Sequence, residues 1–208
     1  KNLLSKVKIS GGGRCNVTHA CFDPKQLVTY YPRGSKALLG AFFRFQPQDT
    51  IDWFTNNGVD LKTESDGRVF PCSDSSRSII NCLVNTAKNL NIHIWTFCKV
   101  NSIKKQDHTF DINYQNNQDI QCEKLILATG SNPSGYRFAT GLGHQLIKPI
   151  PSLFSFEIKD NLLTQLAGLG VNNVGLALKS KPKNSQYGPL LITHWGLSGP
   201  GIIKLSAW

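Results

Sequence analysis

The residues with the clearest capacity for chemistry lie at positions 10–18, which read Ser-Gly-Gly-Gly-Arg-Cys-Asn-Val-Thr. Glycine adopts positive φ at little steric cost, and without a Cβ it lets the main chain approach a bulky ligand. Successive N–H groups in such a loop form a concave anion site, and Arg14 adds a planar fork of donors suited to a phosphate or an electron-rich ring. The segment therefore predicts a binding loop for a phosphate-bearing ligand, with a flexible glycine-rich turn as the alternative.

Two other side chains have the chemistry for a catalytic role. Cys15 follows Arg14, and a neighbouring cation favours the reactive thiolate, although Cys15 could instead pack as a small apolar residue beneath a ligand. His194 lies between Thr193 and Trp195 and could donate a proton to a substrate, or it could be a hydrogen-bonded structural residue at a domain junction. The six cysteines form no Cys-x-x-Cys pair and no ligand-like cluster with histidine, so no metal site is predicted.

Residues 10–18 resemble the signature of the YhiN/BaiN-like family of bacterial FAD- and NAD(P)-dependent oxidoreductases, which are relatives of the glutathione-reductase-type flavoproteins. Three more stretches fit the family in the same order, and together the four span most of the chain. They are Gly-Arg-Val-Phe-Pro at 67–71 with Ser73 and Asp74, Leu-Ile-Leu-Ala-Thr-Gly at 125–130, and Thr-His-Trp-Gly-Leu-Ser-Gly-Pro at 193–200.

The resemblance implies a flavoprotein that binds FAD non-covalently, takes hydride from NAD(P)H and passes it to an acceptor. Hydride chemistry belongs to the flavin, while the protein supplies position and electrostatics. His194 and Cys15 are the candidate catalytic residues. The residues that the resemblance places at the cofactor are Gly11, Gly12, Gly13, Arg14, Cys15, Asn16, Val100, Ala128, Thr129 and Gly130.

The acceptor is left open by the motifs, because members of the family are linked both to dihydrouridine formation in ribosomal RNA and to bile-acid reduction. Residues 1–48 contain eight lysines and arginines against Asp23 alone, a net charge of +7 out of +10 for the chain. A flavin pyrophosphate carries only about two charges, so the surplus favours contact with RNA, unless acidic segments of a longer parent neutralise it. A third reading is a non-enzymatic RNA-binding module, which would leave the flavoprotein motifs unexplained.

Helical and strand spacing predict the elements that must position these residues. Asp23-Pro24 predicts a helix start, and Ser35 and Ser75 predict two further caps. Aromatic residues at helical spacing favour core packing over a flavin-stacking surface. The predicted helices are 24–31, 36–45, 49–57, 76–90 and one that starts near 202. The predicted strands are 59–64, 68–70, 92–96, 99–104, 109–114, 119–122, 125–128, 153–158, 173–179 and 189–193.

The order of these elements predicts an α/β fold. A β-meander followed by the apolar strand 125–128, of the type buried in a parallel sheet, matches part of a glutathione-reductase-like FAD-binding domain. Pro149 and Pro151 mark a boundary. We therefore predict a partial FAD-binding domain at 1–150 and the start of an inserted antiparallel, barrel-like β domain at 151–208.

Two further expectations concern the context of the chain. A dinucleotide fold normally opens with a strand, a G-x-G-x-x-G turn and a helix, and no such unit occurs here. Together with the absence of methionine, this leads us to expect an internal segment of a longer flavoprotein, carrying only part of a flavin site. No apolar run approaches 18 residues and no signal-peptide pattern is present, so a cytoplasmic location without membrane contact is predicted.

Overall fold

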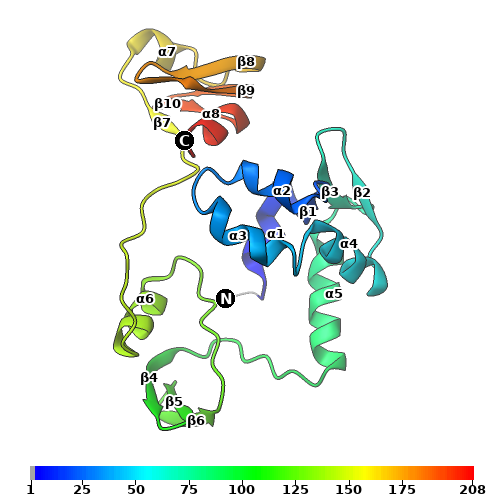
Figure 1. Cartoon of the computed structure of the whole chain (residues 1–208), viewed down its shortest axis with the longest axis vertical. Helices are drawn as coiled ribbons and strands as arrows, with labels where there is room; N and C mark the ends of the chain where they lie inside the picture. Colours follow the sequence, from blue (N-terminus) through cyan, green and yellow to red (C-terminus); the bar gives the residue numbers. More distant parts are fainter. Residues whose placement is uncertain (1–2) are drawn as a thin grey trace. The chain divides into compact units, whose positions relative to one another are not determined.

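The computed structural model describes residues 3–208, except for the side chains of 181–183 (Figure 1). The chain forms two compact units, Lys1–Leu146 and Ile147–Trp208. The assignment of these units to a FAD-binding domain and an inserted domain stays a prediction. Along the described residues, no helix is long and apolar enough to cross a membrane.

The first unit begins with short helices and a small antiparallel sheet. Its sheet has the order β1-β3-β2, so β3 is the central strand. These elements are α1 (Ser5–Ile9), the 3-10 turn η1 (Ser10–Gly13), β1 (Thr18–His19), α2 (Pro24–Leu27), η2 (Val28–Tyr30), α3 (Ser35–Phe42), α4 (Pro47–Asn56), β2 (Leu61–Thr63), β3 (Arg68–Pro71) and α5 (Ser76–Asn89).

Local capping explains where these helices begin. The Asp23 carboxylate accepts a hydrogen bond from the Lys25 N–H at 2.9 Å, and Ser75 caps α5 in the same way, as predicted. The predicted cap at Ser35 is wrong, because Ser35 is the first residue of α3. Gly34, with φ of 83°, takes the cap position instead and makes the left-handed turn that precedes the helix.

The core of this unit lies under β3. Val69, Phe70 and Pro71 are its most completely buried large side chains. A neighbouring apolar cluster joins the glycine segment to α4 and α5, and its buried members are Cys15, Phe54, Val59, Ile79 and Cys82. The glycine-rich segment is therefore built onto the packed part of the unit.

A three-stranded meander follows, as predicted. Its strands are β4 (Val100–Gln106), β5 (Thr109–Tyr114) and β6 (Gln118–Cys122), paired antiparallel in sequence order. The helix α6 (Pro133–Gly141) comes next and was not anticipated from the sequence. It begins as capping rules require, with Pro133 at the first position and the Asn132 side chain accepting from the Ser134 N–H at 3.0 Å.

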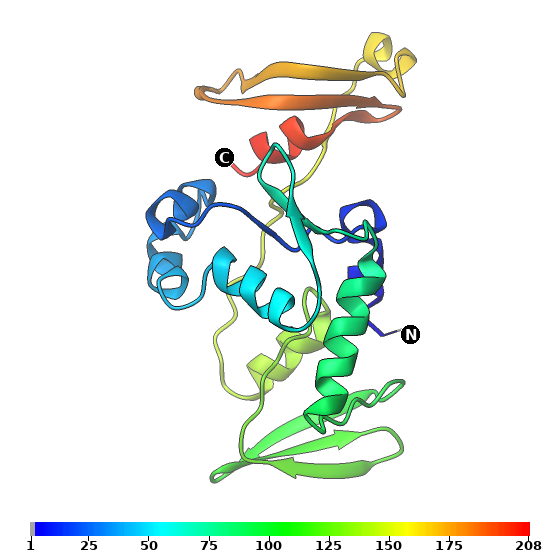
Figure 2. The same ribbon diagram turned by 90° about the vertical axis from the view of Figure 1, so that its right-hand side faces the viewer.

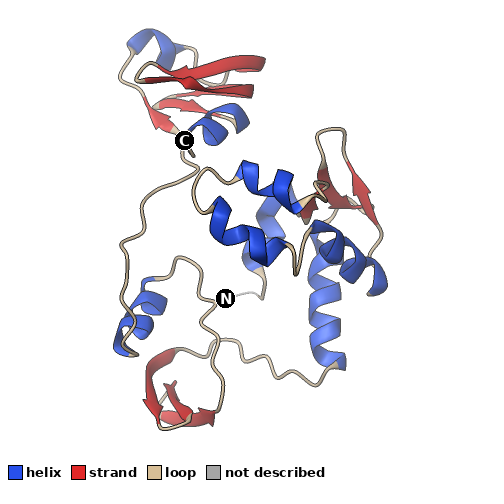
Figure 3. Ribbon diagram, in the orientation of Figure 1, coloured by secondary structure: helices blue, strands red, loops and turns tan. Residues whose placement is uncertain are grey.

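Two predicted strands are wrong. Residues 92–96 and 125–128 lie in the loops from α5 to β4 and from β6 to α6 (Figure 3). A strand needs a neighbour for its N–H and C=O groups, and all three sheets in residues 3–208 pair antiparallel without including either segment. The apolar run at 125–128 is accordingly open to solvent, with 88% of Ile126 exposed.

The second unit is an open antiparallel sheet. The predicted antiparallel pairing is confirmed, but the barrel-like form is wrong, because the sheet has the order β7-β10-β9-β8 and does not close. The long strands β8 and β9 lie side by side with α8 against them (Figure 2). The elements are β7 (Phe156–Glu157), α7 (Asn161–Gln165), β8 (Gly170–Leu178), β9 (Lys181–Thr193), β10 (Gly196–Ser198) and α8 (Pro200–Leu205).

Candidate functional site

The three glycines adopt the left-handed conformation that their pattern predicts. Gly11, Gly12 and Gly13 have φ of 55°, 68° and 85°. A Cβ on Gly11 would lie 2.7 Å from the Asn16 nitrogen and 3.1 Å from the Phe70 ring, whereas a Cβ on Gly12 would have no atom within 4 Å. Gly11 is thus required by packing, and Gly12 faces open space that a ligand can enter.

Main-chain hydrogen bonds hold this loop against the central strand. The Cys15 N–H donates to the Ser10 carbonyl at 3.0 Å, and the Val17 N–H donates to the Val69 carbonyl at 2.8 Å. With its amide oriented to satisfy both partners, Asn16 donates to the carbonyls of Thr18 and Val69. The loop is therefore fixed in position before any ligand binds.

Arg14 connects the loop to the β2–β3 hairpin. Its Nη1 donates to Glu64 Oε1 at 2.6 Å and to Asp74 Oδ1 at 3.4 Å, and its Cζ lies 3.9 Å from the centre of the Phe70 ring. These hydrogen bonds, led by that of Glu64, raise the pKa of Arg14. In the structure Arg14 positions the loop, while its contact with a phosphate stays a prediction.

The two carboxylates were missed at the sequence level. Glu64 is 50 residues from Arg14 and Asp74 is 60 residues away, so no local spacing connects them. Asp74 belongs to the family-like motif at 67–74, and this was the one sequence signal that pointed to a role for either carboxylate. The Arg68 Nη2 also donates to Glu64 Oε2 at 3.2 Å. The Glu64 carboxylate therefore pairs with two guanidinium groups, Arg14 and Arg68, that both lie over the Phe70 ring.

The structure places Cys15 in the apolar core. The residue is 8% exposed, has φ of 65° and packs with Phe54, Val59, Ile79 and Cys82. This environment supports the packing alternative over a nucleophilic thiol, because a reactive cysteine is usually accessible and surrounded by positive charge. The catalytic role of Cys15 stays a prediction.

A cavity of about 810 Å³ in the first unit brings two predicted cofactor residues together. Val100, from the start of β4, and Thr129, from the loop before α6, both line it, together with the cationic side chains of Lys99 and Arg137. Asn132 and Ser134 at the α6 N-terminus complete a polar rim. A helix N-terminus and nearby cations favour an anionic ligand. The other lining residues are Leu3, Leu4, Thr96, Phe97, Cys98 and Phe138.

Helix α1 connects this cavity to the glycine loop. Leu3 and Leu4 line the cavity just before α1, and the loop follows directly after its last residue. At about 1.5 Å per residue, a five-residue helix rises about 7.5 Å. The side chain of Lys6 in α1 also lies beside Gly130: a Cβ on Gly130 would be 3.8 Å from the Lys6 Nζ. The loop and the cavity are therefore neighbours along one short helix.

A comparison with known protein families identifies the family of the chain. The HI0933-like protein Rossmann domain matches residues 1–201. The chain belongs to the HI0933-like family. Membership of this FAD-binding Rossmann family confirms the resemblance to YhiN/BaiN-like flavoproteins.

Three curated relatives of this HI0933-like chain are named for a function. The "Ribosomal RNA dihydrouridine synthase" of Escherichia coli (strain K12) is 30% identical over 214 residues, covering 98% of this chain and 52% of the relative. The protein of that name from Haemophilus influenzae is 28% identical over 219 residues, covering 99% and 53%. The "3-dehydro-bile acid delta(4,6)-reductase" of Clostridium scindens is 25% identical over 215 residues, covering 99% and 51%. The chain spans about half the length of the relatives it matches.

The residues of the HI0933-like chain fit the dinucleotide part of FAD. The cavity offers cations and a helix N-terminus for a pyrophosphate, and Phe97 and Phe138 give it apolar wall. Ala128 and Gly130 flank Thr129 on the exposed loop but do not line the cavity. Gly12 provides a second open approach beside the main chain.

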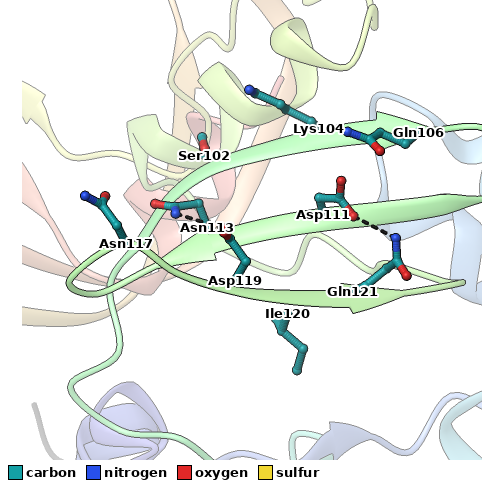
Figure 4. Close-up of a pocket in the computed structure, with 9 residues that line it drawn as sticks. All are labelled: Ser102, Lys104, Gln106, Asp111, Asn113, Asn117, Asp119, Ile120 and Gln121. Atoms are coloured by element: carbon teal, nitrogen blue, oxygen red, sulfur yellow. Dashed lines mark hydrogen bonds between the residues drawn. The ribbon is translucent and has the colours of Figure 1, made fainter.

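Another concave surface of the HI0933-like chain has one cation, Lys104, but lacks a helix N-terminus and aromatic rings. Polar side chains on one face of the meander border a space of about 640 Å³. Figure 4 shows these side chains, with Ile120 pointing to the opposite face of the sheet. Asn113 donates to Asp119 at 2.8 Å and Gln121 donates to Asp111 at 2.9 Å. Since these amides and carboxylates form hydrogen bonds with one another, we interpret this face as a solvent-exposed surface rather than a ligand site. Within residues 3–208, no group of three or more His, Cys, Asp and Glu residues could hold a metal ion.

His194 lies in the second unit, on the tight turn between β9 and β10. Its side chain is exposed. His194 belongs to the second unit, whereas the cavity and the glycine loop belong to the first. Its role as a proton donor stays a prediction.

The carboxylates that pair with Arg14, Lys62 and Arg68 predict a loss of stability in acid. Hydrogen bonds from Lys62 and then from Arg14 lower the pKa of Asp74, and the Arg68 main-chain N–H lowers that of Asp66. A lowered pKa in the folded state stabilises the protein above the unfolded pKa of about 3.9, and this contribution is lost as pH falls through the folded value. We expect the Asp74→Asn variant to show a flatter decline of melting temperature between about pH 5 and pH 2 than the unmodified protein. Parallel curves from thermal unfolding would contradict the role of Asp74.

Proposed function

We propose that this chain forms the FAD-binding portion of an oxidoreductase that transfers hydride from NAD(P)H, through FAD, to an acceptor. The observation that carries the proposal is the meeting of Val100 and Thr129, two predicted cofactor residues 29 positions apart, in one cation-lined cavity. Family membership supports the same assignment.

In this proposal the chain's residues bind and orient the dinucleotide. Arg137, Lys99 and the α6 N-terminus would hold the pyrophosphate, and the main chain at Val100 would contact the adenosine side. The glycine loop, fixed by Arg14 and the β3 hydrogen bonds, gives the isoalloxazine side a close main-chain surface. Bound FAD would supply the hydride transfer.

Gly135→Ala is expected to weaken FAD binding at least about tenfold, a change of about 1.4 kcal/mol. A Cβ at Gly135 would lie 1.8 Å from Thr129 Oγ1 and 2.9 Å from Thr129 Cβ, so rotation of the hydroxyl alone cannot relieve the contact. The cavity wall must then move. The dissociation constant can be measured by titrating FAD into the protein and following flavin fluorescence.

Gly141→Ala is the matched control for this experiment. Gly141 belongs to the same helix, and a Cβ there would have no atom within 4 Å. We expect this variant to bind FAD with the affinity of the unmodified protein. Equal affinities for Gly135→Ala and Gly141→Ala, or a protein that does not bind FAD, would contradict the proposed site.

A second candidate concerns the acceptor, which we propose to be a uridine in ribosomal RNA. It is favoured by the net charge of +7 in residues 1–48 and by the names of the Escherichia coli and Haemophilus influenzae relatives. The Clostridium scindens relative instead supports a small-molecule enone. The two acceptors are distinguished by testing whether a ribosomal RNA fragment or a 3-dehydro bile acid reoxidises the NADPH-reduced protein.

A further inference from the structure

The segment 22–45, which contains α2, η2 and α3, exposes an unusual number of aromatic rings. Five of them are at least 40% exposed within 24 residues, and no residue of α3 is buried. Single exposed apolar residues are normal in proteins, but several exposed rings on one short segment indicate a binding surface. The rings and their exposed fractions are Phe22 at 45%, Tyr30 at 61%, Tyr31 at 40%, Phe43 at 62% and Phe45 at 58%.

Positive charge is interleaved with these rings. The segment contains Lys25, Arg33, Lys36 and Arg44 against one acidic residue, Asp23, whose carboxylate is used to cap α2. Across the described part of the chain, no carboxylate forms an ion pair with Lys25, Lys36 or Arg44, and all three residues are exposed. Their charge is therefore available to an anionic partner.

The shape of α3 also suits a flat ligand. Besides Lys36, the exposed positions of α3 are the small residues Ala37, Gly40 and Ala41, and a Cβ on Gly40 would have no atom within 4 Å. A planar group can therefore approach the helix surface closely, with a cation at each end of the exposed face and Phe43 beside it.

We propose that this surface, the aromatic–basic surface of residues 22–45, binds single-stranded RNA. Unpaired bases present π-faces that stack on aromatic rings, while the backbone phosphates pair with lysine and arginine. A duplex hides its base faces, and a purely apolar protein partner gives no role to the unpaired cations. The choice of RNA over single-stranded DNA rests on the second candidate acceptor above, whereas the stacking argument is independent of flavin binding.

The test uses the protein and a fluorescein-labelled 15-nucleotide oligouridine, followed by fluorescence anisotropy at several salt concentrations. Phe43→Ala and Phe45→Ala are each expected to weaken binding about tenfold through loss of a stacked base. Lys36→Ala and Arg44→Ala are each expected to lower the slope of log affinity against log salt by about 0.7, the value for one phosphate contact on a single strand.

Matched controls come from exposed residues outside the surface. Tyr187→Ala removes a 75% exposed ring from the second unit, and Lys88→Ala removes an exposed lysine from α5. Both are expected to bind oligouridine normally. Circular dichroism melting curves establish that each variant is folded, and oligothymidine and duplex RNA of the same length serve as comparison ligands.

Several results would overturn the proposal. They are a protein that does not bind oligouridine, aromatic variants that bind as tightly as the unmodified protein, and duplex RNA or oligothymidine that binds more tightly than oligouridine. FAD affinity measured on the same samples separates this proposal from the flavin proposal. RNA binding without FAD binding would contradict the flavin site alone, and FAD binding without RNA binding would contradict this surface alone.

Discussion

Replacing Gly11 with alanine is expected to destabilise the protein by about 2–4 kcal/mol and to weaken FAD binding at least about tenfold. Two costs add at this position. A left-handed φ of 55° disfavours any residue with a Cβ, and that Cβ would overlap the Asn16 nitrogen at 2.7 Å. The main chain at Asn16 cannot yield without disturbing the hydrogen bonds to β3. Urea unfolding and FAD titration measure the two effects separately.

Gly12→Ala provides the control for this prediction. Gly12 has a similar φ of 68°, but a Cβ there meets no atom within 4 Å. We therefore expect only the conformational cost of about 1–2 kcal/mol. If the loop faces the flavin as proposed, Gly12→Ala also weakens FAD binding, because its methyl group enters the open space. Identical unfolding free energies for the two variants would show that the contact with Asn16 is unimportant.

Phe70→Ala is expected to lower the free energy of unfolding by about 3–5 kcal/mol. Phe70 is completely buried on the central strand, with the Arg14 guanidinium stacked over its ring and the Gly11 main chain beside it. Its removal leaves a cavity where the hairpin and the glycine loop meet. Since whole domains are stabilised by about 5–15 kcal/mol, this variant should be close to unfolding at moderate temperature.

The exposed Phe43 is the comparison residue for Phe70. Phe43→Ala removes the same side chain from a position that is 62% exposed, so its unfolding free energy should change by no more than about 0.5 kcal/mol. Urea unfolding of both variants tests the difference. A loss below about 1 kcal/mol for Phe70→Ala would mean that the core is not centred on β3.

Local signals accounted for much of the fold. The α2 and α5 caps, the β2–β3 hairpin and the meander were predicted because each depends on neighbouring residues, such as Asp23 with Lys25 or one strand with the next. The predicted strands at 92–96 and 125–128 failed because a strand also requires a distant partner. An apolar pattern shows that a segment can form a strand, but it does not show which other strand the fold places beside it.

For the candidate site, the sequence by itself determined the residue types: a glycine loop with positive φ, an adjacent arginine, and small residues at 128–130. Its motifs also predicted the flavoprotein family that the comparison confirmed. Only the tertiary structure decided that Arg14 pairs with Glu64 and Asp74, that Cys15 is buried, and that Val100 and Thr129 share a cavity. Backbone conformation depends on the residues nearby in the chain, whereas ion pairs and cavities depend on which distant segments the fold brings together.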